Sequence, residues 1–204
     1  MKEKIDWNFH NAWEKDWWGS CANTMGEELK QQAYAKKMGL KWTSSHKTSF
    51  ILNGGEASIM DIGGGPVSLL LKTARCGRRY VVDPCDYPPW VSERYRLSGI
   101  QLVRMKAEEL KSAGIPIVDE CWMYNCLQHV ESPEDVISAA LEQCRIFRVC
   151  EPVGTRISNG HPHSFDADRL NSLLGGEGKV EHVRDSGVDG VLYFGIFKGH
   201  HYEE

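Results

Sequence analysis

The fold of this chain is decided by residues 57–68, which read ASIMDIGGGPVS. The apolar run at 59–62 predicts a short strand that is buried on both faces of a sheet. Three glycines follow at 63–65, and they let the backbone turn sharply and approach a ligand closely. Pro66 suits the first turn of a helix, and we expect a buried helix to continue through 67–71. Together, a strand, a glycine turn and a helix N-terminus present free N–H groups to a ligand.

The nature of that ligand is indicated by Asp61, which lies two residues before the first glycine. Gly63, Gly65 and Ser68 come close to the G-x-G-x-x-G/A dinucleotide fingerprint. A carboxylate at the end of the strand, however, repels a pyrophosphate and attracts an ammonium group. S-adenosylmethionine (SAM) carries an ammonium, a carboxylate and a sulfonium group and no phosphate. The helix N-terminus could take its carboxylate while Asp61 faces its ammonium, directly or through water.

At this point the sequence resembles the class I SAM-dependent methyltransferases, whose first motif is an acidic residue followed by G-x-G-x-G. The match departs from that motif at its last glycine, where Val67 stands. The resemblance covers roughly residues 50–198. It implies SAM as the cofactor and transfer of a methyl group to an O, N, C or S atom of a small-molecule acceptor. For this stretch alone, a tight turn that binds no ligand is the alternative.

Strand and helix patterns alternate from residue 57 onward, which predicts a parallel sheet with helices on both faces. The resembled fold ends in an antiparallel hairpin that closes the sheet. We therefore predict an α/β, Rossmann-like, doubly wound fold with a mostly parallel seven-stranded sheet and a C-terminal antiparallel hairpin. Further strands are expected at 79–83, 100–105, 117–124, 145–153, 179–184 and 190–197. Helices are expected at 66–75, 91–97, 133–144 and 165–174.

Residues 1–50 differ from the methyltransferase core expected over 51–204. Tryptophan and phenylalanine crowd the first twenty residues among charges. A helix is expected at 26–38, and Thr24 and Glu27 have the spacing of a capping box. We interpret this segment as an N-terminal helical, Trp-rich extension. Either it only packs onto the core or it forms a lid over the cofactor or the substrate.

The string WWGSCANT at residues 17–24 looks too specific for a helix that serves packing alone. It is similar to N-terminal segments of some bacterial and phage methyltransferases.

Acidic residues follow the second and third predicted strands. Asp83 lies 22 residues after Asp61, and an acidic residue near this spacing accepts hydrogen bonds from ribose hydroxyls in nucleotide-binding folds. NAD and SAM both need such a residue, so Asp83 does not choose between them. After the third strand, Glu108 or Glu109 would meet the adenine amino group in the resembled family. Carboxylates favoured by a helix dipole are the alternative for this pair.

The segment NCLQHV at 125–130 follows the fourth strand and resembles the N-x-L-x-H segment of small-molecule methyltransferases. Ligands of open α/β sheets bind outside the carboxyl ends of the strands, so Asn125 and His129 are placed for function. His129 is the candidate catalytic base, and a packing or capping histidine ahead of Pro133 is the alternative. The segment lacks the N-P-P-Y or D-P-P-Y pattern of enzymes that methylate amino groups of DNA or glutamine.

The resemblance thus implies one catalytic residue, His129, and a set of cofactor-binding residues. The set is Asp61, Gly63, Gly64, Gly65, Asp83, Glu108 and Asn125. His161 and His163 flank a proline, but no third ligand with recognisable spacing accompanies them, so no metal site is expected.

Composition limits the remaining classes. The 204 residues carry a formal net charge of −4 without a basic block, so no nucleic-acid module is indicated. Seven cysteines form no C-x-x-C pair, and no apolar run approaches the length of a membrane span of about 18 residues. No signal-peptide pattern begins at residues 1–4, and a cytoplasmic location is expected. A non-catalytic SAM-binding scaffold and an NAD(P)-linked oxidoreductase are the rival functions, although the latter's Tyr-x-x-x-Lys pair is missing.

Overall fold

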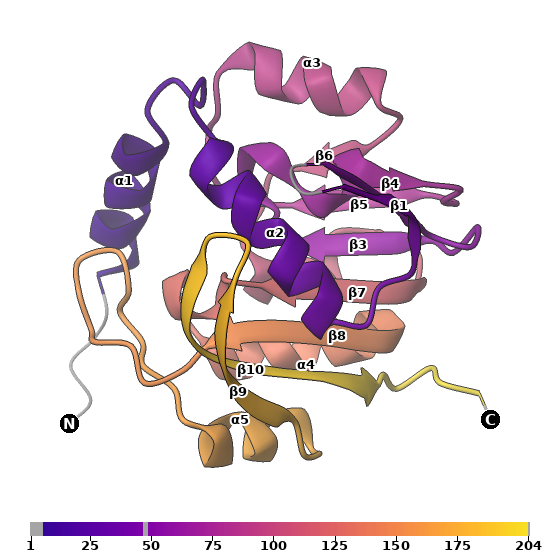
Figure 1. The fold of residues 1–204 in the computed structure, drawn as a ribbon. Helices are drawn as coiled ribbons and strands as arrows, with labels where there is room; N and C mark the ends of the chain where they lie inside the picture. Colours follow the sequence, from indigo (N-terminus) through magenta and orange to yellow (C-terminus); the bar gives the residue numbers. More distant parts are fainter. Residues whose placement is uncertain (1–5, 47–48, 204) are drawn as a thin grey trace.

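A seven-stranded sheet forms the centre of the computed structural model, which describes residues 6–46 and 49–203 (Figure 1). The strand order is β6-β5-β3-β7-β8-β10-β9; the first five strands are parallel, and β10 is antiparallel to both of its neighbours. The predicted sheet and C-terminal hairpin are therefore confirmed. The expectation that no signal-peptide pattern begins at residues 1–4 concerns residues outside those that the structure describes. The strands are β3 (Ile59–Ile62), β5 (Arg79–Val82), β6 (Gln101–Val103), β7 (Val118–Tyr124), β8 (Cys144–Pro152), β9 (Lys179–Asp185) and β10 (Val188–Lys198).

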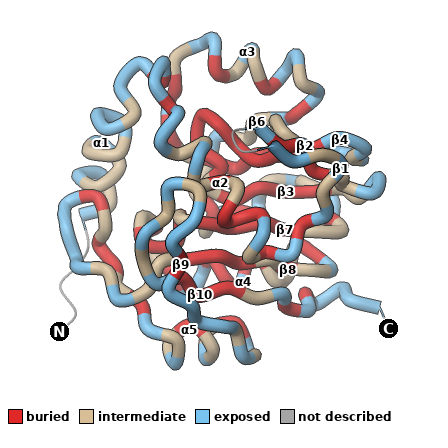
Figure 2. Tube along the Cα trace, in the orientation of Figure 1, coloured by how far each residue is buried: buried red, intermediate tan, exposed pale blue. Residues whose placement is uncertain are grey.

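Helices cover both faces of this sheet, as the doubly wound prediction requires. All four residues of β3 are buried because β5 and β7 flank the strand and helices pack above and below it (Figure 2). Alternate side chains enter two separate cores: Met60 and Ile62 pack with α4 and α5, whereas Ile59 packs with α2 and α3. The helices are α2 (Met25–Lys37), α3 (Pro89–Leu97), α4 (Pro133–Gln143) and α5 (Ala167–Leu174).

The prediction of a helix at 66–75 is wrong. Two 3₁₀ turns, η1 (Gly65–Val67) and η2 (Leu69–Lys72), and the short strand β4 (Thr73–Ala74) occupy this stretch. Ser68 separates the turns with an extended backbone (φ −45°, ψ 146°). The N–H groups of Ser68 and Leu69 donate to the hydroxyls of Tyr95 and Tyr124, both at 3.0 Å, instead of to helical carbonyls. Contacts with distant tyrosines therefore replace the helix that the local sequence favours.

The N-terminal segment contains two helices and part of a second sheet. Strands β1 (Trp42–Ser45) and β2 (Phe50–Asn53) join β4 in a three-stranded sheet that the sequence did not predict. Helix α2 agrees with the expected 26–38 to within one residue. The capping box is wrong, because Thr24 makes no side-chain cap and its hydroxyl instead donates to Glu28 at 2.7 Å.

Helix α1 (Trp7–Trp18) lies beyond the carboxyl ends of the central strands and meets the core through Trp18, which packs against the cluster that contains Ile59 (Figure 1). None of its residues is fully buried. Asp6 caps its first turn by accepting from the Phe9 N–H at 3.2 Å. The carboxyl ends of the central strands are thus not covered by the sheet's own helices, and α1 lies over them (Figure 1).

Candidate functional site

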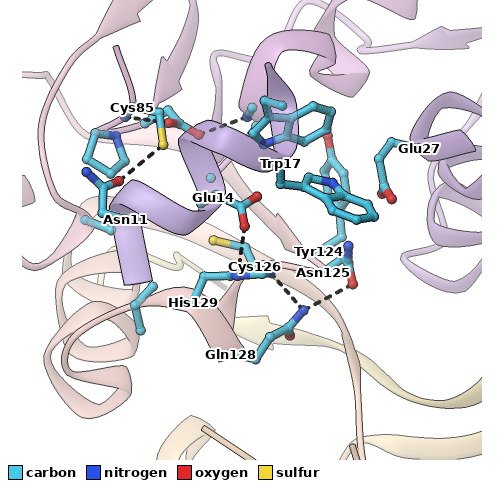
Figure 3. A pocket seen from close by; sticks show the side chains of 18 of the residues that line it. Asn11, Glu14, Trp17, Glu27, Cys85, Tyr124, Asn125, Cys126, Gln128 and His129 are labelled. Carbon is cyan, nitrogen blue, oxygen red and sulfur yellow. Dashed lines mark hydrogen bonds and ion pairs between the residues drawn. The ribbon is translucent and has the colours of Figure 1, made fainter. Parts of the chain in front are cut away.

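A cavity of about 510 Å³ lies between α1 and the carboxyl ends of β3, β5 and β7 (Figure 3). Ligands of open α/β sheets bind at this edge. The structure brings together in the cavity wall seven of the eight residues singled out from the sequence. These are Gly63, Gly64, Gly65, Asp83, Glu108, Asn125 and His129.

The glycine turn after β3 has no room for side chains. Gly63 has φ +70°, and a Cβ there would lie 2.0 Å from the sulfur of Cys126. A Cβ on Gly64 would lie 2.9 Å from Asp61 Oδ2. Two hydrogen bonds fix Gly65: its N–H donates to Asp83 at 3.0 Å, and its carbonyl accepts from Tyr95 at 2.6 Å. The turn therefore presents bare backbone to the cavity in a fixed conformation.

Asp61 lies beneath this turn and outside the cavity wall. Its fully buried carboxylate accepts from the hydroxyls of Ser68 and Tyr124, the latter at 2.8 Å. Burial raises its pKa to about 7. A direct contact with a ligand ammonium, one of the two arrangements expected from the sequence, is therefore not available to Asp61 as it lies here. Among the residues that the structure describes, none bonds to its Oδ1 atom, so the carboxylate still has capacity for a donor. A contact through water stays a prediction.

Asp83, just after β5, is held by three donors. Its Oδ1 accepts from the Cys85 N–H at 2.9 Å and from the Tyr87 hydroxyl at 3.0 Å, while Oδ2 accepts from Gly65. Burial raises its pKa above the ordinary aspartate value, and these hydrogen bonds oppose the shift. The carboxylate thus connects the end of β5 to the glycine turn at the cavity floor. Its contact with a ribose stays a prediction.

Of the two glutamates after β6, Glu108 lines the cavity and Glu109 does not. Glu108 lies in the turn η3 (Ala107–Ser112), and its Oε1 accepts from the N–H groups of Glu131 and Ser132 at 2.9 and 3.0 Å. The side chain therefore also joins η3 to the start of α4. Recognition of adenine by Glu108 stays a prediction.

The loop after β7 is shaped by Glu151, a residue to which the sequence-based reasoning gave no role. Asn125 adopts φ +50°, a left-handed conformation that is uncommon outside glycine. The fully buried Glu151 carboxylate at the end of β8 accepts from the N–H groups of Cys126 and Leu127 at 3.0–3.2 Å. Burial raises the pKa of Glu151 to about 8. An acidic residue at the end of an apolar strand, next to the strand that bears Asn125, is the signal that could have indicated it.

His129 ends the turn η4 (Leu127–His129) and faces the cavity. Its Nε2 atom lies 3.2 Å from the amide of Gln128, and its ring centroid lies 4.8 Å from that of His161. Burial, with a smaller contribution from His161, lowers the pKa of His129 to about 4. The imidazole is therefore neutral at pH 7 and a weaker base than an ordinary histidine, whose pKa lies close to working pH. Its catalytic role stays a prediction.

The structure adds Glu14 of α1, which the sequence-based reasoning did not consider. Its Oε2 lies 3.4 Å from His129 Nδ1, and the indole N–H of Trp18 donates to its carboxylate. Burial and the charge of Asp83 raise the pKa of Glu14 to about 7. In the sequence, Glu14 is one of several charged residues in an aromatic segment. Only the packing of α1 shows that the side of the helix bearing Glu14 faces the cavity.

Three core loops hold α1 in place over this cavity. The Cys85 thiol donates to Asn11 at 3.3 Å, and the Lys106 ammonium lies 3.9 Å from the ring centroid of Trp7. The ring of Trp13 fills the space beside Gly160, where a Cβ would lie 2.2 Å from it. Helix α1 therefore touches the segments after β5, β6 and β8, and it covers the cavity from outside.

Neither a cluster of metal-ligating side chains nor a membrane-crossing helix occurs in the part of the chain that the structure describes. Within residues 6–46 and 49–203, no group of three or more His, Cys, Asp or Glu side chains could hold a metal ion. His163 turns away from His161, and its Nε2 contacts the carbonyl of Val130 at 2.9 Å. Over the same described residues, no helix is both long and apolar enough to cross a membrane.

No protein-family model matches the sequence, and no curated protein matches it. Solved structures do resemble the fold. The putative methyltransferase of Haloferax volcanii, solved in complex with the activator Trm112, superposes with a TM-score of 0.62 at 12% identity, covering 94% of this chain and 98% of that one. The N-methyltransferase NodS from Bradyrhizobium japonicum, in complex with S-adenosylhomocysteine (SAH), gives a TM-score of 0.62 at 14% identity, with 95% and 99% coverage. A 1,6-didemethyltoxoflavin-N1-methyltransferase from Burkholderia thailandensis gives 0.56 at 14% identity, with 94% and 84% coverage.

The chain has the class I SAM-dependent methyltransferase fold. The fold predicted from the resemblance in sequence is thereby confirmed. At these identities the comparisons concern architecture, so the function has to be argued from the cavity itself.

Proposed function

We propose that this protein is a SAM-dependent methyltransferase that acts on a small-molecule acceptor. The single observation that carries the proposal is the cavity itself. In a methyltransferase fold, it joins the bare glycine turn, Asp83 and Asn125 beneath a covering helix. Two of the similar structures, NodS and the toxoflavin methyltransferase, contain bound SAH, which supports SAM as the cofactor.

The residues present fit this cofactor. The turn leaves the backbone of Gly63 and Gly64 without side-chain cover, while the N–H of Gly63 donates to Val82 and that of Gly65 to Asp83. Among the described residues, Asp61 Oδ1 beneath the turn has no hydrogen-bond partner. A volume of about 510 Å³ lies within the range of small-ligand sites. The glycine turn would hold the amino-acid part, Asp83 the ribose and Glu108 the adenine. Val67, at the last glycine of the motif, is 2% exposed and lines the cavity, and its carbonyl accepts from the Gln31 amide of α2.

SAM supplies an electrophilic methyl group, and the protein's task is to position and desolvate the acceptor. Helix α1 excludes water from above, with Trp13 and Trp17 stacked at 5.7 Å between ring centroids. His129 is neutral but a weak base at its lowered pKa of about 4, so it would orient the acceptor, and would act as a base only where substrate binding raises its pKa. A small acceptor is favoured because α1 covers the cavity, whose volume is about 510 Å³.

A non-catalytic SAM-binding scaffold is the second candidate, favoured by the departure at Val67. Both candidates predict SAH binding, and only the methyltransferase converts SAM to SAH in the presence of an acceptor. The test is incubation of the protein with SAM and a library of small amines, phenols, thiols and carbon acids, followed by measurement of SAH. Acceptor-dependent SAH that disappears in the His129→Asn variant supports the proposal. SAH binding without turnover on any acceptor favours the scaffold.

A further inference from the structure

The cavity contains a carboxylate that no cation faces. Glu14 points from α1 into the cavity, and 20% of its side chain is exposed (Figure 3). It faces three other elements: Asp83 after β5, Glu27 in α2, and His129 after β7. Among the residues that the structure describes, no ion pair joins Glu14 to a lysine or arginine. Its neighbours are thus two carboxylates, a neutral imidazole and the indole of Trp18.

The cations nearest the cavity are already paired. Lys30 forms an ion pair with Glu27, and Lys106 forms one with Glu131 at 2.7 Å while lying over Trp7. Asp83 is satisfied by its three hydrogen-bond donors. A buried carboxylate without such partners is costly unless it is protonated or meets a cation. The centre of the cavity therefore favours a ligand that brings positive charge to Glu14.

Glu14 also lies at the position where such a charge would be expected. Asp83 marks the ribose end of the cavity, and the glycine turn with Asn125 marks the amino-acid end. Glu14 interacts electrostatically with Asp83 and lies 3.4 Å from His129, so it spans the region between these ends. In SAM, the sulfonium joins the ribose to the amino-acid part. We propose that Glu14 faces the sulfonium of SAM and makes the protein prefer SAM to SAH.

This inference rests on the proposed function and gives α1 a chemical role beyond that of a cover. When the methyl group leaves, the electron pair of the S–CH₃ bond stays on sulfur, and the sulfonium becomes a neutral thioether. The attraction to Glu14 then disappears, whereas the contacts with ribose, adenine and the amino-acid part persist. The product SAH is thus held less tightly by the same cavity, which favours its release.

The test is calorimetric titration at pH 8 with SAM, SAH and sinefungin, which carries a protonated amine near the sulfonium position. The variants are Glu14→Gln and, as a matched control, Asp16→Asn, which removes one charge from an exposed position of the same helix. We expect Glu14→Gln to weaken SAM and sinefungin about tenfold and SAH less than twofold, and Asp16→Asn to behave as the wild type. An equal loss of affinity for all three ligands, or no loss for any, overturns the inference. Either result leaves the proposal that the protein binds SAM unaffected. A wild-type protein that binds none of them overturns the proposed function as well.

A second readout is the dependence of this preference on pH. SAM and SAH share their ammonium and carboxylate groups, so the ratio of their dissociation constants reports the sulfonium alone. The pKa of Glu14 is raised to about 7; ionisation above that pH strengthens the preference for SAM, and protonation below it removes the preference. His129, with its pKa lowered to about 4, stays neutral throughout this pH range. Asp83 and Glu27 face position 14 in the wild type and in both variants. The preference should shrink from pH 8 to pH 6 in the wild type and shrink less in Glu14→Gln, where Asp61, whose pKa is also raised to about 7, still titrates. The same slope in both proteins would contradict the assignment.

Discussion

Replacing Gly63 by alanine tests whether the glycine turn is as tightly enclosed as it is in this structure. The residue has φ +70°, and the added Cβ would lie 2.0 Å from Cys126 Sγ and 2.9 Å from Cys126 Cβ. The left-handed conformation costs alanine roughly 1–2 kcal/mol, and overpacking adds roughly 1–3 kcal/mol. We therefore expect Gly63→Ala to lower the free energy of unfolding by about 2–5 kcal/mol, a large share of the 5–15 kcal/mol typical of domains.

The matched control is Gly55→Ala, because Gly55 has φ +60° and no atom within 4 Å of the added Cβ. This control bears the conformational cost alone, so roughly 1–2 kcal/mol is expected. Urea unfolding followed by tryptophan fluorescence measures both variants, and calorimetry measures their affinity for SAH. Cys126→Ala in the Gly63→Ala background removes the nearest atom and should restore part of the loss. A Gly63→Ala variant no less stable than Gly55→Ala, with no gain from Cys126→Ala, would refute this reasoning.

Three further predictions concern the cavity and its supports. Asp83→Ala should weaken SAH binding tenfold to a hundredfold, since charge-assisted hydrogen bonds to ribose contribute roughly 1.5–3 kcal/mol; calorimetry that gives an unchanged dissociation constant removes Asp83 from the site. The pKa of Glu151 is raised from 4.5 to about 8 in the folded state, so the folded protein retains a proton that the unfolded chain releases, and stability should fall as pH rises through this range. Urea unfolding at pH 5 and pH 8 should show a smaller fall in Glu151→Gln, and an equal fall in both proteins would exclude this contribution. SAH should slow proteolysis within α1 and change the fluorescence of Trp17, which is 65% exposed, with Trp17→Phe as the control; cleavage that ignores SAH would mean that α1 only packs.

The sequence predicted best those features that depend on local pattern. The apolar run before the glycines fixed the position of β3, and the strand ends placed Asp83, Asn125 and His129 at one edge of the sheet. The helix at 66–75 failed because Tyr95 and Tyr124, distant in sequence, take the N–H groups of residues 68 and 69.

The parts of the site that the sequence did not reveal depend on tertiary packing. Glu14 meets the cavity only because the loops after β5, β6 and β8 orient α1. Glu151 supports the Asn125 loop because β8 lies beside β7 in the sheet, with Tyr124 opposite Cys150. The position of Glu151 at the end of an apolar strand marks it as a candidate, but its partners follow only from the strand order, and no local pattern indicates the orientation of Glu14.

Calorimetric titration of the purified protein with SAH and, separately, with NAD is the most direct measurement of what this cavity binds. Asp61 beneath the glycine turn and Glu14 in α1 both have pKa values raised to about 7, so at pH 8 both are mostly ionised, which disfavours a pyrophosphate and favours the cationic groups of SAM. We predict one molecule of SAH bound per chain and no heat from NAD. Binding of NAD without any response to SAH would contradict the assignment of this cavity to SAM.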